Sequence, residues 1–249
     1  MMSELIIFTH SSYSDIWPPV ISYAENHVKD TLPVRFAADT NVLGHTTYLY
    51  NPESTYPTRI LEILAQTTSK YVLLVHDVDL IMNFDATIYP QIIGYMERKN
   101  ITRFSLEAFP PETACGDMVG PLHVATLTPN CSRRFVTPYD VGPSIWNRDD
   151  LIAIMTKHSS ETYRSIEESG IQSTCLAYSF VGICETDTEL LHIIGRPFSA
   201  RFAFCHLLSH GEWICPEGRH SYTSFFDMFF ERWGIDPLKR GFMPYHSGI

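Results

Sequence analysis

Continuous apolar runs alternate with amphipathic stretches along the first hundred residues of the chain. The runs at residues 5–8, 34–38 and 71–75 are mostly apolar without a polar alternation, which is typical of strands covered on both faces. Helical patterns at residues 15–28 and 57–65 separate these runs, and each has proline near its start, where the helix tolerates it. The alternation of strand and helix predicts an α/β fold with a mixed, mainly parallel central sheet flanked by helices.

The second half of the chain carries weaker signals of the same kind. Asn147 is placed to cap a helix, because an asparagine side chain accepts hydrogen bonds from the first turn. A long loop is expected at residues 109–120, where two prolines and two glycines gather. The remaining expected elements are helices at 86–98, 161–178 (with a break near Gly170) and along the aromatic tail, and strands at 101–108, 121–127 and 139–146. With no repeat or linker in view, we expect one domain over residues 1–249.

Composition narrows the class of protein without identifying it. The chain has 249 residues, of which 45% are apolar and 18% charged, so it is long enough and apolar enough to fold. Its formal charge of −10 argues against a duplex nucleic acid as partner, because binding the phosphate backbone needs a basic surface. No apolar run approaches the roughly 20 residues of a membrane span. We therefore expect a soluble or cytoplasmic protein without a membrane span; the sequence leaves the oligomeric state open.

An acidic triplet follows the most hydrophobic run of the chain. In Asp77-Val78-Asp79 the alternation of an extended chain points both carboxylates the same way and turns Val78 back into the core. Ligands of open α/β sheets bind beyond the carboxyl ends of the strands. Two adjacent carboxylates repel each other unless a cation stabilises them, and oxygen ligands suit Mn²⁺ or Mg²⁺. The triplet therefore predicts a divalent metal site, against the plainer interpretation of a solvated turn.

Two further groups of residues could take part in the chemistry. Arg59 lies in the first turns of the helix before the acidic strand, where its guanidinium could bind a phosphate or a base or could simply be exposed. His206 or His210 could complete a metal site that the aspartates begin. A rival interpretation is a zinc cluster, although its spacings do not match paired Cys-x₂-Cys ligands; its members would be Cys205, His206, His210, Cys215 and His220.

With these residues in view, the sequence resembles a known family. Residues 71–83 resemble the strand and DVD motif of GT-A fold glycosyltransferases, and the HDVDL motif at 76–80 is especially similar to that of β-1,4-galactosyltransferases. A helix led by an aromatic-x-x-Arg sequence precedes the motif at the spacing of that family, at Tyr56–Arg59. Residues 195–206 are similar to the segment that ends in the metal-binding histidine of the family. The resemblance covers residues 5–85 and 193–213.

The resemblance implies a role for each matching position. Asp79 would bind Mn²⁺ directly, Asp77 would support the ribose and the metal shell, and His206, or else His210, would be a further metal ligand. A donor-binding half at about residues 1–100 would hold a UDP-sugar, and a second half at about 101–249 would hold the acceptor and complete the metal site. The expected donor-site residues are Thr9, His10, Ser11, Asp39, Arg59, Asp77, Val78 and Asp79.

The resemblance weakens where the family carries its acceptor contacts and its general base. The tryptophan- and glycine-rich segment that ends in Glu-Asp-Asp has no clear copy here, so Glu168 is the first candidate for the base and Asp150 the second. The function expected is metal-dependent, inverting transfer of a hexosyl or pentosyl group from a UDP-sugar to a glycan hydroxyl. The alternatives are a metal-dependent hydrolase and a non-catalytic module that binds nucleotide sugars or carbohydrates.

Overall fold

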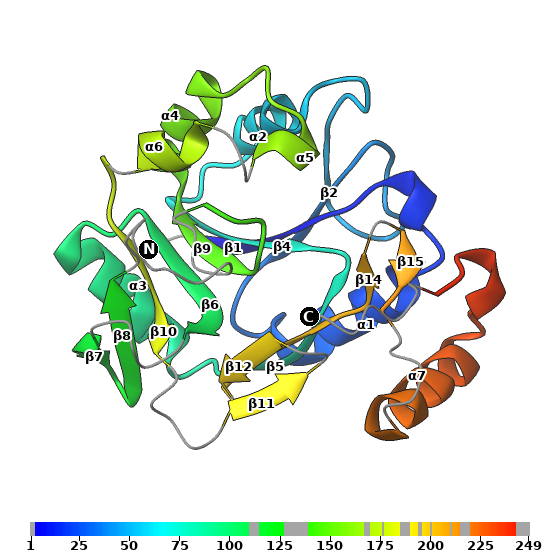
Figure 1. Ribbon diagram of the computed structural model, residues 1–249. Coiled ribbons are helices and arrows are strands. Elements are labelled where there is room, and N and C mark those ends of the chain that lie inside the picture. Colours follow the sequence, from blue (N-terminus) through cyan, green and yellow to red (C-terminus); the bar gives the residue numbers. More distant parts are fainter. Residues whose placement is uncertain are drawn as a thin grey trace.

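The structure is a computed structural model. It describes residues 3–109, 115–126, 139–166, 170–175, 177–184, 190–193, 196–199, 201–209, 211–214 and 220–242. A 13-stranded sheet runs through these residues, with helices on both of its faces (Figure 1).

The first half of the chain forms the parallel part of the sheet. Its strands are β1 (Ser3–Phe8), β2 (Val34–Ala38), β3 (Thr47–Leu49) and β4 (Tyr71–His76), and they lie in the order β3-β2-β1-β4. All three neighbouring pairs are parallel. The predicted strands are confirmed here to within two residues at each end. β1, β2 and β4 are mostly apolar because alternate side chains, such as Leu5 and Ile6, enter core clusters on opposite faces.

The sheet continues with strands from the second half of the chain. β9 (Ser144–Asn147) lies between β4 and β6 (Arg103–Phe109) and is antiparallel to both. β6 therefore runs in the same direction as β4, and β10 (Phe180–Cys184) is parallel to β6. β8 (Leu122–Thr126) and β7 (Cys115–Val119) complete the path as an antiparallel pair. The mixed, mainly parallel sheet that the sequence predicts is thus confirmed, with β9 and β8 as the reversed strands of this path.

Three sequence-based expectations differ from the structure. β7 lies inside the stretch expected to be a loop, because cross-strand pairing with β8 accommodates its polar residues. The strand expected over 139–146 begins only at Ser144. Helix α1 (Trp17–His27) begins two residues after the expected start at residue 15, and its N-cap residue Ile16 makes no side-chain hydrogen bond.

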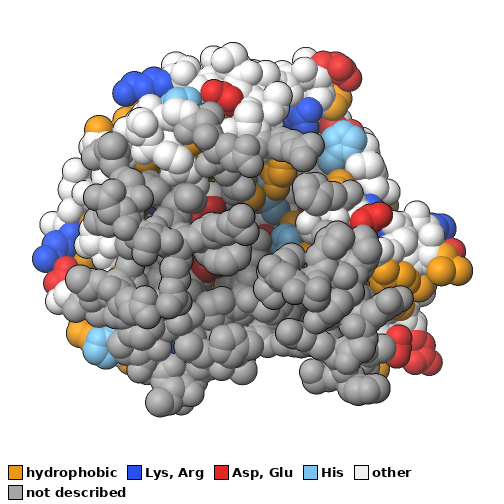
Figure 2. All heavy atoms as spheres, viewed as in Figure 1, with side chains coloured by type: hydrophobic (Ala, Val, Ile, Leu, Met, Phe, Trp, Pro, Cys, Tyr) orange, Lys and Arg blue, Asp and Glu red, His pale blue; other side chains and the backbone are white. Residues whose placement is uncertain are grey.

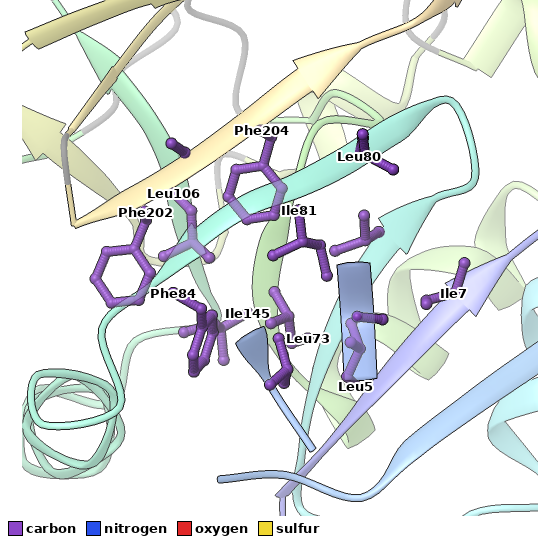
Figure 3. Close-up of a cluster of buried hydrophobic side chains, with 14 of the residues drawn as sticks. Leu5, Ile7, Leu73, Leu80, Ile81, Phe84, Leu106, Ile145, Phe202 and Phe204 are labelled. Carbon is purple, nitrogen blue, oxygen red and sulfur yellow. The ribbon is translucent and has the colours of Figure 1, made fainter. Parts of the chain in front are cut away.

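A second ladder packs against one face of the parallel strands. β5 (Asp79–Phe84) pairs with β13 (Phe202–His206), which is joined through β12 (Arg196–Ser199) to β11 (Leu190–Ile193). Figure 3 shows side chains of this ladder, among them Ile81 and Phe204, directed toward Leu5 and Leu73 of the sheet. A short hairpin of β14 (Leu208–Ser209) and β15 (Glu212–Trp213) follows β13. The ladder brings residues more than a hundred positions apart to the end of β4.

Helices cover the two faces of the sheet. The core on one face includes side chains of α1, α3 (Tyr89–Lys99) and α7 (His220–Trp233). The core on the other face includes those of α2 (Tyr56–Leu64), α4 (Arg148–Lys157), α5 (Tyr163–Ile166) and α6 (Ile171–Cys175). Two 3₁₀ turns, η1 (Ser11–Tyr13) and η2 (Pro237–Lys239), complete the elements. Within the described part of the chain, every helix is too short or too polar to cross a bilayer.

Candidate donor and metal site

Several of the predicted site residues meet at one edge of the sheet. Because β1, β2 and β4 are parallel, their carboxyl ends lie side by side. Thr9 follows β1, Asp39 follows β2, and Asp77 follows β4. This is the edge at which ligands of open α/β sheets bind. The order of the strands therefore brings together residues that lie far apart in the sequence.

Asp77 is a buried carboxylate held by the loop after β1. Its backbone N–H donates to the carbonyl oxygen of Phe8 at 2.9 Å, and its Oδ2 accepts a hydrogen bond from the hydroxyl of Thr9. The indole N–H of Trp17 donates to Thr9 Oγ1 at 2.7 Å and fixes that hydroxyl in turn. Burial, with the negative charge of Asp79 added to it, raises the pKa of Asp77 to about 7 against the opposing effect of Thr9. A cation beside Asp77 would remove this penalty.

Asp79 meets His206, as the resemblance led us to expect. Asp79 is the first residue of β5 and pairs in register with His206, the last residue of β13. Nδ1 of His206 lies 2.6 Å from Oδ1 of Asp79, and the two side chains are 17% and 3% exposed. The N–H of Leu207 donates to the carbonyl oxygen of Val78 at 2.7 Å. This bond ties the end of β13 to residues 77–79, which we call the acidic turn. Asp79 and His206 lie 127 positions apart in the sequence.

The residues present suit a metal ion that a substrate also binds. Among the described residues, no group of three or more His, Cys, Asp or Glu side chains is arranged to hold a metal ion. Carboxylate oxygen and imidazole nitrogen are nevertheless donors that Mn²⁺ accepts, and small divalent ions are commonly bound by one or two carboxylates together with phosphate oxygens and water. Asp79 and His206 bring one donor of each kind together, and Asp77 lies two residues before Asp79 in the chain. His210 lies outside the described residues.

The zinc interpretation finds no support in the described residues. Cys205 is fully buried in the core, and burial raises the pKa of its thiol far above its usual range, which disfavours the thiolate that zinc needs. Since side chains alternate along β13, Cys205 and His206 face opposite sides of the strand. His210 and Cys215, the next members of that cluster, lie outside the described residues.

Asp39 is held as an ionised carboxylate beside β1. Ser11 donates to it twice, from its backbone N–H at 2.7 Å and from its hydroxyl at 2.6 Å, and Nε2 of His10 lies 3.5 Å away. Burial acts to raise the pKa of Asp39, but the hydrogen bonds from Ser11 and the charge of His10 outweigh it and leave the pKa below its usual value. The three residues form one polar group at the ends of β1 and β2.

Two stacked aromatic rings, those of Phe8 and Tyr50, lie next to this group and form what we call the aromatic wall. The sequence pattern did not predict them. The ring of Tyr50 stacks on Phe8 with 5.1 Å between centroids, and the guanidinium of Arg59 lies 5.4 Å from the centre of the same Tyr50 ring. Arg59 also donates to the carbonyl oxygens of Ser54, at 2.9 Å, and of Pro52. Arg59 is thus near the predicted donor site, where it orders the loop after β3 and supports Tyr50. The isolated tyrosine at the end of a short strand gave no signal of this role.

A second aromatic group lies at the end of β4. His76 is buried, its Nε2 lies 3.2 Å from the hydroxyl of Tyr56, and burial lowers its pKa to about 4, so it is neutral at pH 7. Tyr163 of α5 is half exposed and packs edge-on against Tyr56 with centroids 5.0 Å apart. This places an accessible aromatic ring next to the strand that carries the acidic turn. Figure 2 shows some histidine and acidic atoms near the middle of the view.

Of the two candidate bases, the structure places Asp150 away from the acidic turn. Asp150 follows Asn147, which pairs with Tyr71 at the first residue of β4, whereas the acidic turn follows the last. Its carboxylate accepts a hydrogen bond from Thr102 at 2.8 Å, at the amino end of β6. Asp150 therefore lies in the first turn of α4, at the opposite ends of the strands from the acidic turn. Glu168 lies outside the described residues.

Comparison with known proteins supports the fold. No protein-family model and no curated protein matches the chain. A Staphylococcus aureus TarS fragment in complex with UDP-GlcNAc is similar in structure, with a TM-score of 0.50 and 13% identity over 96% of this chain and 69% of that one. The chain thus shares with that fragment a mixed α/β fold, in which helices flank a large, mainly parallel sheet.

Two further solved structures are more distant. Another TarS 1–349 structure has a TM-score of 0.45 at 13% identity and is covered to 60% of its length by 80% of this chain. UDP-glucose pyrophosphorylase in complex with UDP-glucose has a TM-score of 0.43 at 9% identity, over 74% of this chain and 90% of that one. The chain thus spans about three fifths of the length of that TarS fragment.

Proposed function

We propose that this protein is a metal-dependent glycosyltransferase that moves a hexosyl or pentosyl group from a UDP-sugar to a hydroxyl of a glycan. The observation that carries the proposal is the contact of Asp79 with His206, beside the buried Asp77, at the carboxyl end of β4. A similar fold is known in complex with a nucleotide sugar, UDP-GlcNAc. The carboxylate and imidazole side chains at this position suit a metal ion that is also bound by a diphosphate.

The donor would lie along the carboxyl ends of β1, β2 and β4. Asp39 is ionised and can accept hydrogen bonds from the hydroxyls of a ribose or from the N–H of a base. Ser11 and His10 hold this carboxylate in place, and Arg59 supports the aromatic wall next to it. Thr9 orients Asp77 from the other side of the same loop. These residues would bind the nucleoside, and the diphosphate attached to it would then lie beside the acidic turn.

Asp77, Asp79 and His206 would hold Mn²⁺ or Mg²⁺. When bound, such an ion stabilises the negative charge that develops on the departing diphosphate. The part of the protein is to present two carboxylates whose mutual repulsion and burial favour a cation. Asp79 and His206 would contact the ion, and Asp77 would support it from its hydrogen bond with Thr9.

The acceptor would be bound by the second half of the chain. In the inverting reaction that we propose, the acceptor oxygen attacks the anomeric carbon as the bond to the diphosphate breaks, and a carboxylate within hydrogen-bond reach takes the hydroxyl proton. Glu168 remains the candidate for this base. We propose one domain over residues 1–249, in which residues 1–100 bind the donor and residues 101–249 bind the acceptor and supply His206.

The proposal is tested by the thermal stability of the protein with nucleotide sugars. A ligand that binds only the native state stabilises it by about 2.7 kcal/mol at a hundredfold excess over Kd. We expect one of UDP-GlcNAc, UDP-galactose, UDP-glucose or UDP-xylose to raise Tm, and to raise it further with Mn²⁺. Asp79→Ala should fold and lose the effect of Mn²⁺. Asp117→Ala removes an exposed carboxylate on β7 and should keep the effect.

Three outcomes would contradict or redirect the proposal. Full Mn²⁺-dependent transfer by Asp79→Ala would refute the metal assignment. Release of the sugar to water at the same rate with and without glycan acceptors would favour a hydrolase. Tight binding of a UDP-sugar without turnover over a broad acceptor panel would favour a binding module.

A further inference from the structure

The C-terminal segment is fastened to the loop that follows β1. Arg240, just after η2, donates from Nε to Oδ2 of Asp15 at 2.9 Å and from Nη2 to the other carboxylate oxygen of Asp15. Nη2 also donates to the carbonyl oxygen of Ser12 at 3.0 Å, and the guanidinium lies 4.6 Å from the centre of the Tyr13 ring. Figure 1 shows the red end of the described chain beside the blue segment after β1. One side chain therefore contacts three residues of this loop.

The loop that Arg240 contacts carries the residues of the donor site. Thr9 of this loop binds Asp77, and His10 and Ser11 bind Asp39. Ser12 and Asp15 stand on either side of Tyr13, so Arg240 holds the segment directly after the binding residues. We call residues 9–15 the donor loop.

The same C-terminal segment also contacts the hairpin after His206. The N–H of Trp213 in β15 donates to the carbonyl oxygen of Gly241 at 3.0 Å, next to Arg240 in the chain. Trp213 is fully buried and packs against Phe230 of α7 with centroids 4.8 Å apart. On the same hairpin, a side chain at Gly211 would come within 3.8 Å of the hydroxyl of Tyr13. Arg240 is thus at the junction of the donor loop and the hairpin that continues from the metal side.

The pair of Arg240 and Asp15 is well placed to hold this junction. The two side chains are 12% and 31% exposed, so solvent screens their attraction less than at an open surface. The paired, two-oxygen geometry is specific to arginine, because a lysine ammonium cannot reproduce the planar fork. The Tyr13 ring beneath the guanidinium adds a cation–π contact.

We propose that Arg240 is a positioning residue of the donor site, which clamps the donor loop against the sheet edge so that the site binds a nucleoside diphosphate. The inference rests on the proposed function, because it takes the nucleotide as the ligand of this edge. Arg240 acts through Asp15, Ser12 and Tyr13 and does not itself need to touch the nucleotide. Its loss would leave the loop to be ordered by the ligand, and that ordering lowers affinity.

The experiment measures the Kd of UDP by calorimetry in the presence of Mn²⁺. We expect Arg240→Gln to raise the Kd of UDP about tenfold, as loss of a charge-assisted contact does. Arg240→Lys should have an intermediate effect. The matched control is Arg232→Gln on α7, since Arg232 also stacks on a neighbouring aromatic ring, Trp233, and should leave the Kd unchanged.

Substitution of Asp15 separates clamping from simple charge attraction. Asp15→Asn removes a negative charge and makes the surroundings of the site more positive. If Arg240 acted only by its charge, this variant would therefore bind UDP with a lower Kd than the wild type. The clamp predicts the opposite, a weaker affinity similar to that of Arg240→Gln. The exchange of both charges, Asp15→Arg with Arg240→Asp, should restore part of the affinity that each single change loses. Melting temperatures of all variants are recorded, because a purely structural role would lower Tm and leave the Kd of UDP unchanged.

The outcomes of the two proposals are distinguishable. If the wild-type protein binds no UDP with Mn²⁺, the proposed function fails. If the wild type binds UDP and Arg240→Gln binds it equally well, or if Asp15→Asn binds it more tightly, the clamp is overturned and the proposed function stands.

Discussion

Single residues at the carboxyl end of β4 are held by contacts that the sequence pattern partly foretold. The pairing of the acidic triplet with a histidine more than a hundred residues away followed from a family resemblance, and the structure places His206 against Asp79. The hydrogen bonds of Thr9 to Asp77 and of Trp17 to Thr9 could not be foreseen, because single polar residues show no pattern that identifies their partners. Candidate ligands could be predicted from the sequence, and the residues that orient them could not.

The raised pKa of Asp77 gives a prediction at this scale. A carboxyl with a pKa of about 7 in the metal-free protein is mostly protonated at pH 6 and mostly ionised at pH 8. A metal ion competes with that proton, so we expect the affinity for Mn²⁺ to rise by up to about tenfold per pH unit below pH 7 and to level off above it. Titrations of Mn²⁺ by calorimetry at pH 6, 7 and 8 measure this dependence.

The stability of the metal-free protein should change in the opposite direction. The folded state binds the proton of Asp77 more tightly than the unfolded state does, so this group's contribution to stability is complete below its unfolded pKa of about 4 and is lost as pH rises through about 7. Mn²⁺ should restore the stability at pH 8. In Asp77→Asn both dependences should be much weaker, and an equal Mn²⁺ affinity at pH 6 and pH 8 in the wild type would contradict the prediction.

At the scale of elements, prediction was accurate where burial on both faces dictates the pattern. β1, β2 and β4 are mostly apolar, and their bounds were predicted to within two residues. β5 was missed because its first residues were interpreted only as a metal motif, and β7 because its polar residues resemble a loop. The cap predicted at Asn147 is confirmed, and the reversal of β9 places that helix start, with Asp150, at the far ends of the strands from the acidic turn.

The cap of α4 gives a prediction at the scale of elements. The side chain of Asn147 accepts hydrogen bonds from the backbone N–H groups of Asp149 and Asp150, at 3.1 and 3.4 Å. We expect Asn147→Ala to lower the free energy of unfolding by about 1 kcal/mol, as measured by urea denaturation. Thr156→Ala, an exposed change near the other end of α4, should cost less than about 0.5 kcal/mol. Since the cap lies away from the acidic turn, a large loss of UDP affinity in Asn147→Ala would contradict this account.

At the scale of the whole molecule, buried polar groups fasten strands β6 and β9 of the central sheet to each other. Arg103 of β6 is completely buried; it pairs with Asp140, and its Nε donates to Ser144 Oγ at 3.0 Å. Its guanidinium also lies 5.3 Å from the Trp146 ring. These contacts fasten β9 to β6 and position the segment that leads into β9.

Removal of that buried charge tests its contribution to stability. Arg103→Met leaves the carboxylate of Asp140 without its partner, and we expect a loss of about 3–5 kcal/mol in the free energy of unfolding. The double variant Arg103→Met with Asp140→Ala should lose less than the two single changes added together, because it leaves no unpaired charge. Urea denaturation of the three variants measures both effects, and additive losses would show that the pair is not coupled.

The reversed strand β9 also determines where the chain can be divided. β9 separates β4 from β6. One of the two edges of β4 therefore pairs with β9, residues 144–147, and not with any strand of the first half. A fragment ending near residue 100 would expose β4 as a bare hydrophobic edge, which is a template for aggregation. Residues 1–100 are therefore not a transplantable module, and a chimaera that keeps these residues would have to be joined after β9 and its helix.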